Sequence, residues 1–137
     1  MNRYTYEEIE VGMKESFKVV VRDSDMDDFV RITGDVNPLH SDIEYARNNG
    51  HKRCVVFGML TASYLSTLAG VYLPGERSLI HSVKTKFSGV VYVGDELTVE
   101  GTVTEKNDTF RLIVLKVVIR NKANEKVLKG EMQIGVL

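Results

Sequence analysis

The sequence lacks the features that would tie it to a membrane, to nucleic acid or to a metal cluster. Its unbroken apolar runs, such as 112–115, fall far short of the ~20 residues that span a bilayer. The opening residues, MNRYTYEEI, are too polar for a signal peptide. Lys plus Arg number 18 and Asp plus Glu 19, so the net charge of −1 shows no basic excess of the kind that nucleic-acid binders carry. A lone cysteine, Cys54, and three histidines leave no material for a disulfide or for a multi-cysteine or His-rich metal centre.

These absences predict a cytoplasmic protein that binds neither membranes nor nucleic acid and holds no metal ion. Its 137 residues, of which 43% are hydrophobic and 27% charged, suit one globular domain spanning 1–137. No internal repeat, proline-rich linker or low-complexity tract marks a domain boundary. Function must therefore come from a small cluster of residues.

Helical patterns dominate the first half of the chain. Ser24 is placed to cap a helix whose first turn is acidic, and Gly34 is placed to end it. A second, short helix is expected to begin at Ser41, where the sequence SDIE has the form of a capping box. The stretch 58–70, GMLTASYLSTLAG, carries apolar or small residues on nearly every face, which is typical of a helix that is buried on all sides.

Strand patterns dominate the second half. Residues 97–104 and 127–136 alternate between apolar and polar side chains, as half-buried strands do. Residues 110–120 are apolar on both faces, as a central strand is. A further strand is expected near the start of the chain at 16–22, and a weaker strand pattern occupies 79–87. The combination predicts an α+β fold in which an antiparallel sheet packs against one buried helix.

The loop between the two predicted helices holds three polar side chains in close succession. Asp35, Asn37 and His40 lie within it, and Pro38 restricts the backbone of its own residue and of Asn37. A rigid loop can hold a carboxylate and an imidazole around one water molecule, a pair suited to proton transfer near neutral pH. The alternative is structural, because Asp, Asn and Pro are ordinary turn formers.

The same loop is part of a longer motif. The run FVRITGDVNPLH at 29–40, followed by Ala46, resembles the hydratase motif of the MaoC-like family, which contains (R)-specific enoyl-CoA hydratases and related 3-hydroxyacyl dehydratases. The resemblance continues through FGMLTAS at 57–63, LPG at 73–75, Phe87, and VGDEL at 93–97. It implies the hot-dog fold, an antiparallel sheet wrapped around a long central helix. It also implies dimers with active sites near the subunit interface.

This resemblance assigns roles to individual residues. Asp35 and His40 would hold the water that adds to the β-carbon of a trans-2-enoyl thioester. We expect His40 to act as the base toward water, and Asp35 to orient it or to donate a proton. Asn37 matches a position that supports the catalytic water, although it can equally serve as a turn former. Ser63 matches a helix position that hydrogen-bonds near the catalytic Asp in relatives, with helix packing as the alternative.

Gly58 is expected to act through its backbone. The reaction builds negative charge on the thioester oxygen, and a backbone N–H at the start of a helix is a fixed donor for an oxyanion hole. Glycine lets the substrate approach that N–H, and the alternative is a glycine needed for tight packing. One position departs from the family: many members carry His immediately before this glycine, where this chain has Phe57. The change affects either turnover or only the shape of the pocket.

The resemblance implies a hydro-lyase that reversibly hydrates trans-2-enoyl-CoA to (R)-3-hydroxyacyl-CoA. It needs no cofactor, since the coenzyme A thioester is the substrate. The alternatives are a 3-hydroxyacyl dehydratase acting on acyl carrier protein (ACP), a hot-dog acyl-CoA thioesterase, and a non-catalytic acyl-thioester-binding module. We expect a homodimer or a higher homo-oligomer. Lys52, Arg53, Arg77, Lys84 and Lys86 are candidates for a positive rim that meets coenzyme A phosphates or ACP, with a solvated face as the alternative.

Overall fold

The computed structural model describes all residues from 1 to 137. Five antiparallel strands form one sheet in the order β1-β3-β4-β5-β2. The strands are β1 (Lys14–Val20), β2 (Ser78–Phe87), β3 (Glu96–Asn107), β4 (Leu112–Arg120) and β5 (Lys126–Val136). β4 lies in the middle, as its apolar pattern predicts, and β1 and β2 form the two edges.

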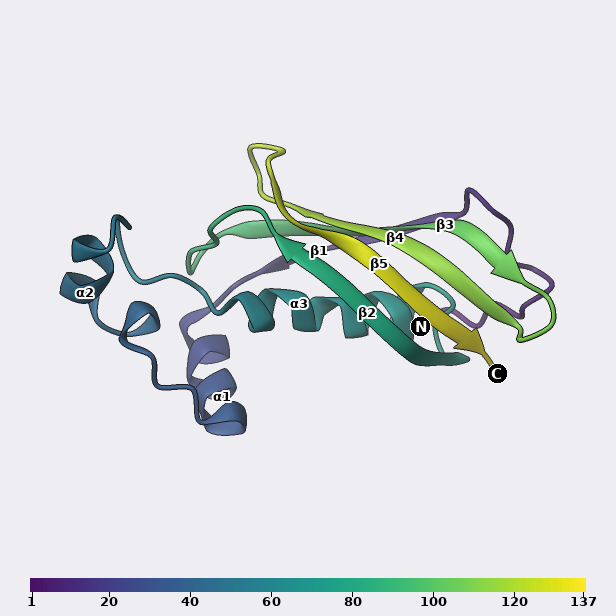
Figure 1. Cartoon of the computed structure of the whole chain (residues 1–137), viewed down its shortest axis with the longest axis horizontal. Helices are drawn as coiled ribbons and strands as arrows, with labels where there is room; N and C mark the ends of the chain where they lie inside the picture. The colour runs from purple at the N-terminus through teal and green to yellow at the C-terminus, as the bar shows by residue number, and fades with distance from the viewer.

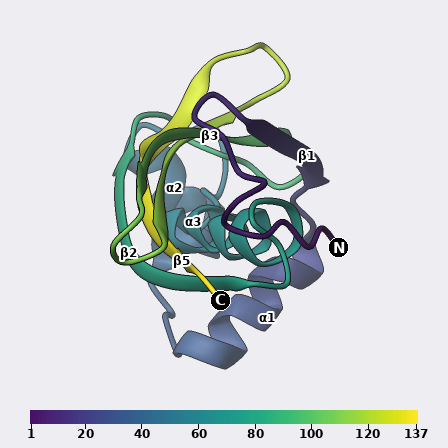
Figure 2. The same ribbon diagram turned by 90° about the vertical axis from the view of Figure 1, so that its right-hand side faces the viewer.

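One helix fills the inside of the curved sheet. α3 (Gly58–Thr67) continues into a π-helical turn, η2 (Leu68–Tyr72), and the strands curl around both (Figure 2). The sheet approaches the central helix closely where the residues of the sheet are small. A Cβ added to Gly101 of β3 would lie 2.9 Å from the Leu68 side chain of η2. A sheet wrapped around a central helix is the predicted architecture.

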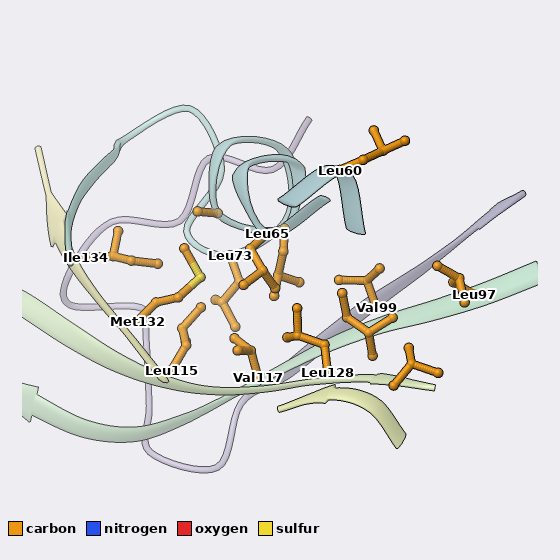
Figure 3. Packing of buried hydrophobic residues seen from close by; sticks show 14 of the residues in the cluster. Leu60, Leu65, Leu73, Leu97, Val99, Leu115, Val117, Leu128, Met132 and Ile134 are labelled. Carbon is orange, nitrogen blue, oxygen red and sulfur yellow. The ribbon is translucent and has the colours of Figure 1, made fainter. Parts of the chain in front are cut away.

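The hydrophobic core lies between α3 and the inner face of the sheet. Figure 3 shows Leu65 and Leu73 among side chains of the sheet such as Leu115, Leu128 and Met132, all of them fully buried. The predicted alternation of β5 is confirmed, because its even-numbered residues from 128 to 136 include the buried apolar ones, while Lys129, Glu131 and Gln133 are exposed. Apolar burial of this kind contributes about 25 cal/mol per Å² to the stability of the fold.

Three short helices between β1 and α3 lie together at one end of the molecule, away from the chain termini (Figure 1). They are α1 (Asp23–Thr33), the 3-10 turn η1 (Pro38–His40) and α2 (Ile43–Asn48). Gly34 ends α1 as predicted, with φ of 73° and its N–H donating to the Val30 carbonyl at 2.7 Å. This end of the molecule carries the loop singled out by its sequence.

Both predicted capping residues are wrong by one or two positions. Ser24 lies inside α1, and the Asp25 carboxylate instead accepts from the backbone N–H of Arg22 at 2.8 Å. Ser41 closes the preceding 3-10 turn, so the cap of α2 is Asp42, whose carboxylate accepts from two N–H groups of the first turn at 2.9 and 3.0 Å. In α1 the N-cap position is Arg22 and no side chain caps the helix. In α2 the carboxylate next to the predicted hydroxyl caps the helix.

α3 is not buried on all sides, contrary to the prediction. Met59, Ser63 and Ser66, which share one face of the helix, are exposed, and the Met59 side chain is 65% accessible. The sheet covers only the opposite side of the helix, so small residues on this face stay open. None of the helices is long and apolar enough to cross a membrane.

Candidate active site

A chain of local hydrogen bonds holds the loop 34–40 in shape. The Thr33 hydroxyl accepts from the N–H of Asp35 at 3.2 Å, and the Asp35 carboxylate accepts from the N–H of Asn37 at 3.1 Å. The Asn37 side-chain carbonyl then accepts from the N–H of Leu39 at 2.9 Å and caps η1. Each side chain satisfies a backbone donor two residues ahead, which is the turn geometry that Thr, Asp and Asn favour. These hydrogen bonds give the loop a defined turn geometry, and its stiffness stays a prediction.

His40 ends η1 and is fastened to a second segment of the chain. Its Nδ1 lies 2.7 Å from the carbonyl oxygen of Val55, and the N–H of Val55 donates to the carbonyl of Leu39 at 3.1 Å. A carbonyl oxygen can only accept, so the neutral imidazole carries its proton on Nδ1. The lone pair is then on Nε2, which has no hydrogen-bond partner in the chain. This is the tautomer that a general base requires.

The N-terminus of α3 offers uncapped backbone donors beside this loop. Phe57 occupies the N-cap position, and no side chain caps the helix. The N–H of Thr61 reaches the carbonyl of Phe57 at 3.1 Å, while the N–H groups of the residues between them precede the first intrahelical acceptor. Free donors at the positive end of a helix dipole suit an anionic oxygen.

One cavity of about 370 Å³ brings these parts together. Its lining includes three of the predicted residues, Asp35, His40 and Gly58. The other lining residues are Phe29, Thr33, Phe57 and Met59. A smaller cavity of about 160 Å³ shares Asp35, His40 and Phe57 with it and also includes Asn37. An acid group, an imidazole and a helix N-terminus thus border one cleft.

The structure places the two predicted supporting residues, Asn37 and Ser63, differently relative to the cavity. Asn37 shapes the loop through its hydrogen bond to Leu39, which agrees with the turn-forming interpretation. Ser63 lies on the exposed face of α3, outside the lining of the cavity, and its hydroxyl donates to the carbonyl of Leu60 at 2.6 Å. Within one chain, therefore, the structure does not bring Ser63 to the catalytic pair.

Thr33 and Phe87 lie next to the functional site, although the sequence motifs that contain them assigned neither a role. Thr33 lies within the recognised motif, and only its contact with Asp35 shows what it does. Phe87 ends β2, and its ring carbons lie 3.2 to 3.5 Å from the position that a Cβ on Gly58 would take. No local signal pairs a strand end with a helix start that lies far from it in the sequence.

The predicted basic rim is not a single feature. The Nζ atom of Lys52 and the Cζ atom of Arg53 lie over the ring of Tyr92, at 4.7 and 5.0 Å from the ring centre. Lys84 and Lys86 border a shallow hollow on β2, β4 and β5 with two further lysines, Lys116 and Lys129. Arg77 donates to the carbonyl of Leu137.

No group of three or more His, Cys, Asp or Glu side chains is arranged to hold a metal ion.

The family model for the MaoC-like domain matches residues 6–126. The chain belongs to the MaoC-like family. An (R)-specific enoyl-CoA hydratase of Rhodospirillum rubrum is 32% identical over 89% of this chain and 90% of its own length. The solved (R)-hydratase from A. caviae superposes with a TM-score of 0.91, at 30% identity, over 96% of this chain and 99% of that one. A mitochondrial 3-hydroxyacyl-(acyl-carrier-protein) dehydratase of Solanum lycopersicum is 38% identical over 57% of this chain and 46% of its own length.

These similarities confirm the predicted family and the hot-dog fold. The predicted enzyme class agrees as well, because the named relatives are hydratases and dehydratases, which are hydro-lyases. In this member of the MaoC-like family, the motif at 29–40 forms the end of α1, the loop and η1.

Proposed function

We propose that this protein catalyses the reversible (R)-specific hydration of trans-2-enoyl-CoA to (R)-3-hydroxyacyl-CoA. The observation that carries the proposal is the cleft bordered by Asp35, His40 and the uncapped N-terminus of α3. The similarity to (R)-specific enoyl-CoA hydratases over most of the chain supports the same reaction and substrate.

The catalytic pair activates water. His40, with its proton held on Nδ1 by Val55, uses Nε2 to remove a proton from a water molecule that Asp35 orients. The water oxygen forms a bond to the β-carbon, and the electron pair of the double bond moves toward the thioester carbonyl. The pair then supplies a proton to the α-carbon, so the net change is the addition of one water molecule.

The N-terminus of α3 stabilises the enolate. Negative charge collects on the thioester oxygen while the β-carbon accepts the water, and the Gly58 N–H is a donor that is already in place. Proton transfer and electrostatic stabilisation complete this chemistry without net oxidation or reduction. We therefore propose that no metal or redox cofactor takes part.

The direct test follows the absorbance of the conjugated enoyl thioester. Purified protein should remove the absorbance of crotonyl-CoA and produce only the (R) alcohol, identified by chiral analysis. Release of free thiol from a saturated acyl-CoA would indicate a thioesterase instead. Binding of crotonyl-CoA without a change in its absorbance would indicate a non-catalytic module.

An ACP-bound substrate is the second candidate, favoured by the similarity to the dehydratase of Solanum lycopersicum. The same cleft would serve, because both carriers present the acyl group as a thioester. Comparing kcat/KM for crotonyl-CoA and crotonyl-ACP at equal concentrations separates the two. A higher value for the ACP form would replace the CoA proposal.

We also propose that two copies pair through β2. This edge strand exposes apolar side chains, including Val83 at 47% and Phe87 at 51%. An open, apolar strand edge favours pairing with another strand. The cytoplasmic location expected from the sequence stays a prediction.

Replacing Val83 with Lys should dissociate this dimer, because a charge would be placed in its apolar centre. Analytical ultracentrifugation should show a dimer for the wild type and a monomer for Val83→Lys. Thr104→Lys adds the same charge at an exposed position of β3. This variant should remain dimeric. A wild-type monomer at micromolar concentration would contradict the pairing.

Replacing Gly58 with Ala should lower kcat/KM for crotonyl-CoA by about tenfold, since the new methyl group obstructs approach to the helix N-terminus. The added Cβ would also lie 3.2 Å from the Phe87 ring, which must move by a few tenths of an ångström. Ser66→Ala, on the exposed face of the same helix, is the control and should keep full activity. An unchanged kcat/KM in Gly58→Ala would argue for a packing role alone.

A further inference from the structure

Phe57 packs directly against the ring of the proposed base. Its ring centre lies 3.9 Å from that of His40, with an angle of 31° between the ring planes. It also contacts Phe29 of α1, at 4.7 Å between ring centres. The three rings join α1, η1 and the start of α3.

His40 has few other restraints. One hydrogen bond, from Nδ1 to Val55, fixes a single atom of the imidazole and still allows the ring to tilt about that bond. The residues that precede it, from Asp35 to Pro38, are exposed and lie outside the packed core. The face contact with Phe57 supplies the missing restraint on the plane of the ring.

Phe57 itself is held firmly. Its side chain is 3% exposed and belongs to the main hydrophobic core. Its backbone is the N-cap of α3, and its carbonyl accepts from the N–H of Thr61. A buried aromatic ring in a close-packed core keeps one orientation, so it can impose that orientation on a neighbour.

Phe57 also precedes Gly58 directly. The residue that packs against the base is therefore one peptide bond away from the proposed oxyanion donor. We propose that Phe57 is a positioning residue, which holds the plane of the His40 imidazole and thereby sets its Nε2 relative to the Gly58 N–H. This proposal rests on the proposed role of His40 as the base. Phe57 carries no group that transfers a proton, so it acts through His40.

The test compares Phe57→Leu, which keeps a buried apolar side chain but removes the ring, with Phe57→Tyr, which restores it. For crotonyl-CoA, Phe57→Leu should lower kcat by about tenfold, because misplacing a catalytic group slows the chemical step. KM should stay within about twofold, since uniform binding is not altered. Phe57→Tyr should recover most of kcat. Ile113→Ala, which also removes three carbons from the core, on β4, should keep kcat and thus control for lost stability.

NMR provides a readout that does not depend on activity. The ring current of Phe57 should shift the His40 ring protons upfield in the wild type, and this shift should disappear in Phe57→Leu. Its absence from the wild-type spectrum would overturn the stacking even if no variant folds. A folded Phe57→Leu with wild-type kcat would overturn the positioning role. If the wild type hydrates no enoyl thioester, the proposed function fails, whereas the spectrum still reports on the stack.

Discussion

Replacing His40 with Ala, or Asp35 with Asn, should lower kcat for hydration of crotonyl-CoA by about 10² or more, the usual size of a general acid–base contribution. His40→Ala removes the Nε2 lone pair that the Val55 hydrogen bond leaves free. Asp35→Asn keeps the shape of the side chain but removes its charge and its ability to exchange a proton. Initial rates at saturating substrate measure both effects.

Controls for these variants come from the same chain. Asp28→Asn makes the same chemical change on the exposed surface of α1, and His51→Ala removes a histidine outside the cavity. Both should keep full activity. If Asp35 and His40 work on one water molecule, the double variant should lose little more than the worse of the single variants. A folded double variant with undiminished activity would remove the assignment.

Replacing Gly130 with Ala should lower the free energy of unfolding by about 3 kcal/mol, the upper end of the cost of overpacking. A Cβ at this position in β5 would overlap the carbonyl oxygen of Lys84 in the neighbouring strand β2. That atom belongs to the backbone, so it can move only if the pairing of β2 with β5 is disturbed. Urea denaturation measures the loss.

Gly70→Ala is the matched control, because the nearest atom to its added Cβ would be 3.8 Å away, an ordinary van der Waals contact. Its stability should be unchanged or slightly raised. Gly130→Ala should also lower hydratase activity, since β2 carries Phe87 against Gly58. A urea midpoint of Gly130→Ala equal to that of the wild type would show that β2 can shift without a loss of stability.

The loop of the site could be predicted because its interactions are local. Thr33, Asp35 and Asn37 each bond to backbone groups two residues ahead, so their order along the chain already specifies the turn. The capping residues were harder to choose. Neighbouring hydroxyls and carboxylates compete for the same backbone N–H groups. Only the path of the backbone decides which side chain reaches those groups.

The contacts around His40 could not be predicted in the same way. Val55 and Phe57 are separated from it by the whole of α2, and neither residue type indicates that it will meet an imidazole. The exposed face of α3 shows the same limit. Small residues reveal that another backbone can approach the helix, but not which side the sheet will cover.

By itself, the order of residues determined the strand alternation, the bend with its carboxylate and imidazole, and the glycine at a helix start, because each depends on neighbours within a few positions. Only the tertiary structure decided which imidazole nitrogen is free, which ring lies against it and which edge of the sheet stays open. These features depend on packing between segments far apart in the chain, where the shape of the core as a whole selects the contacts.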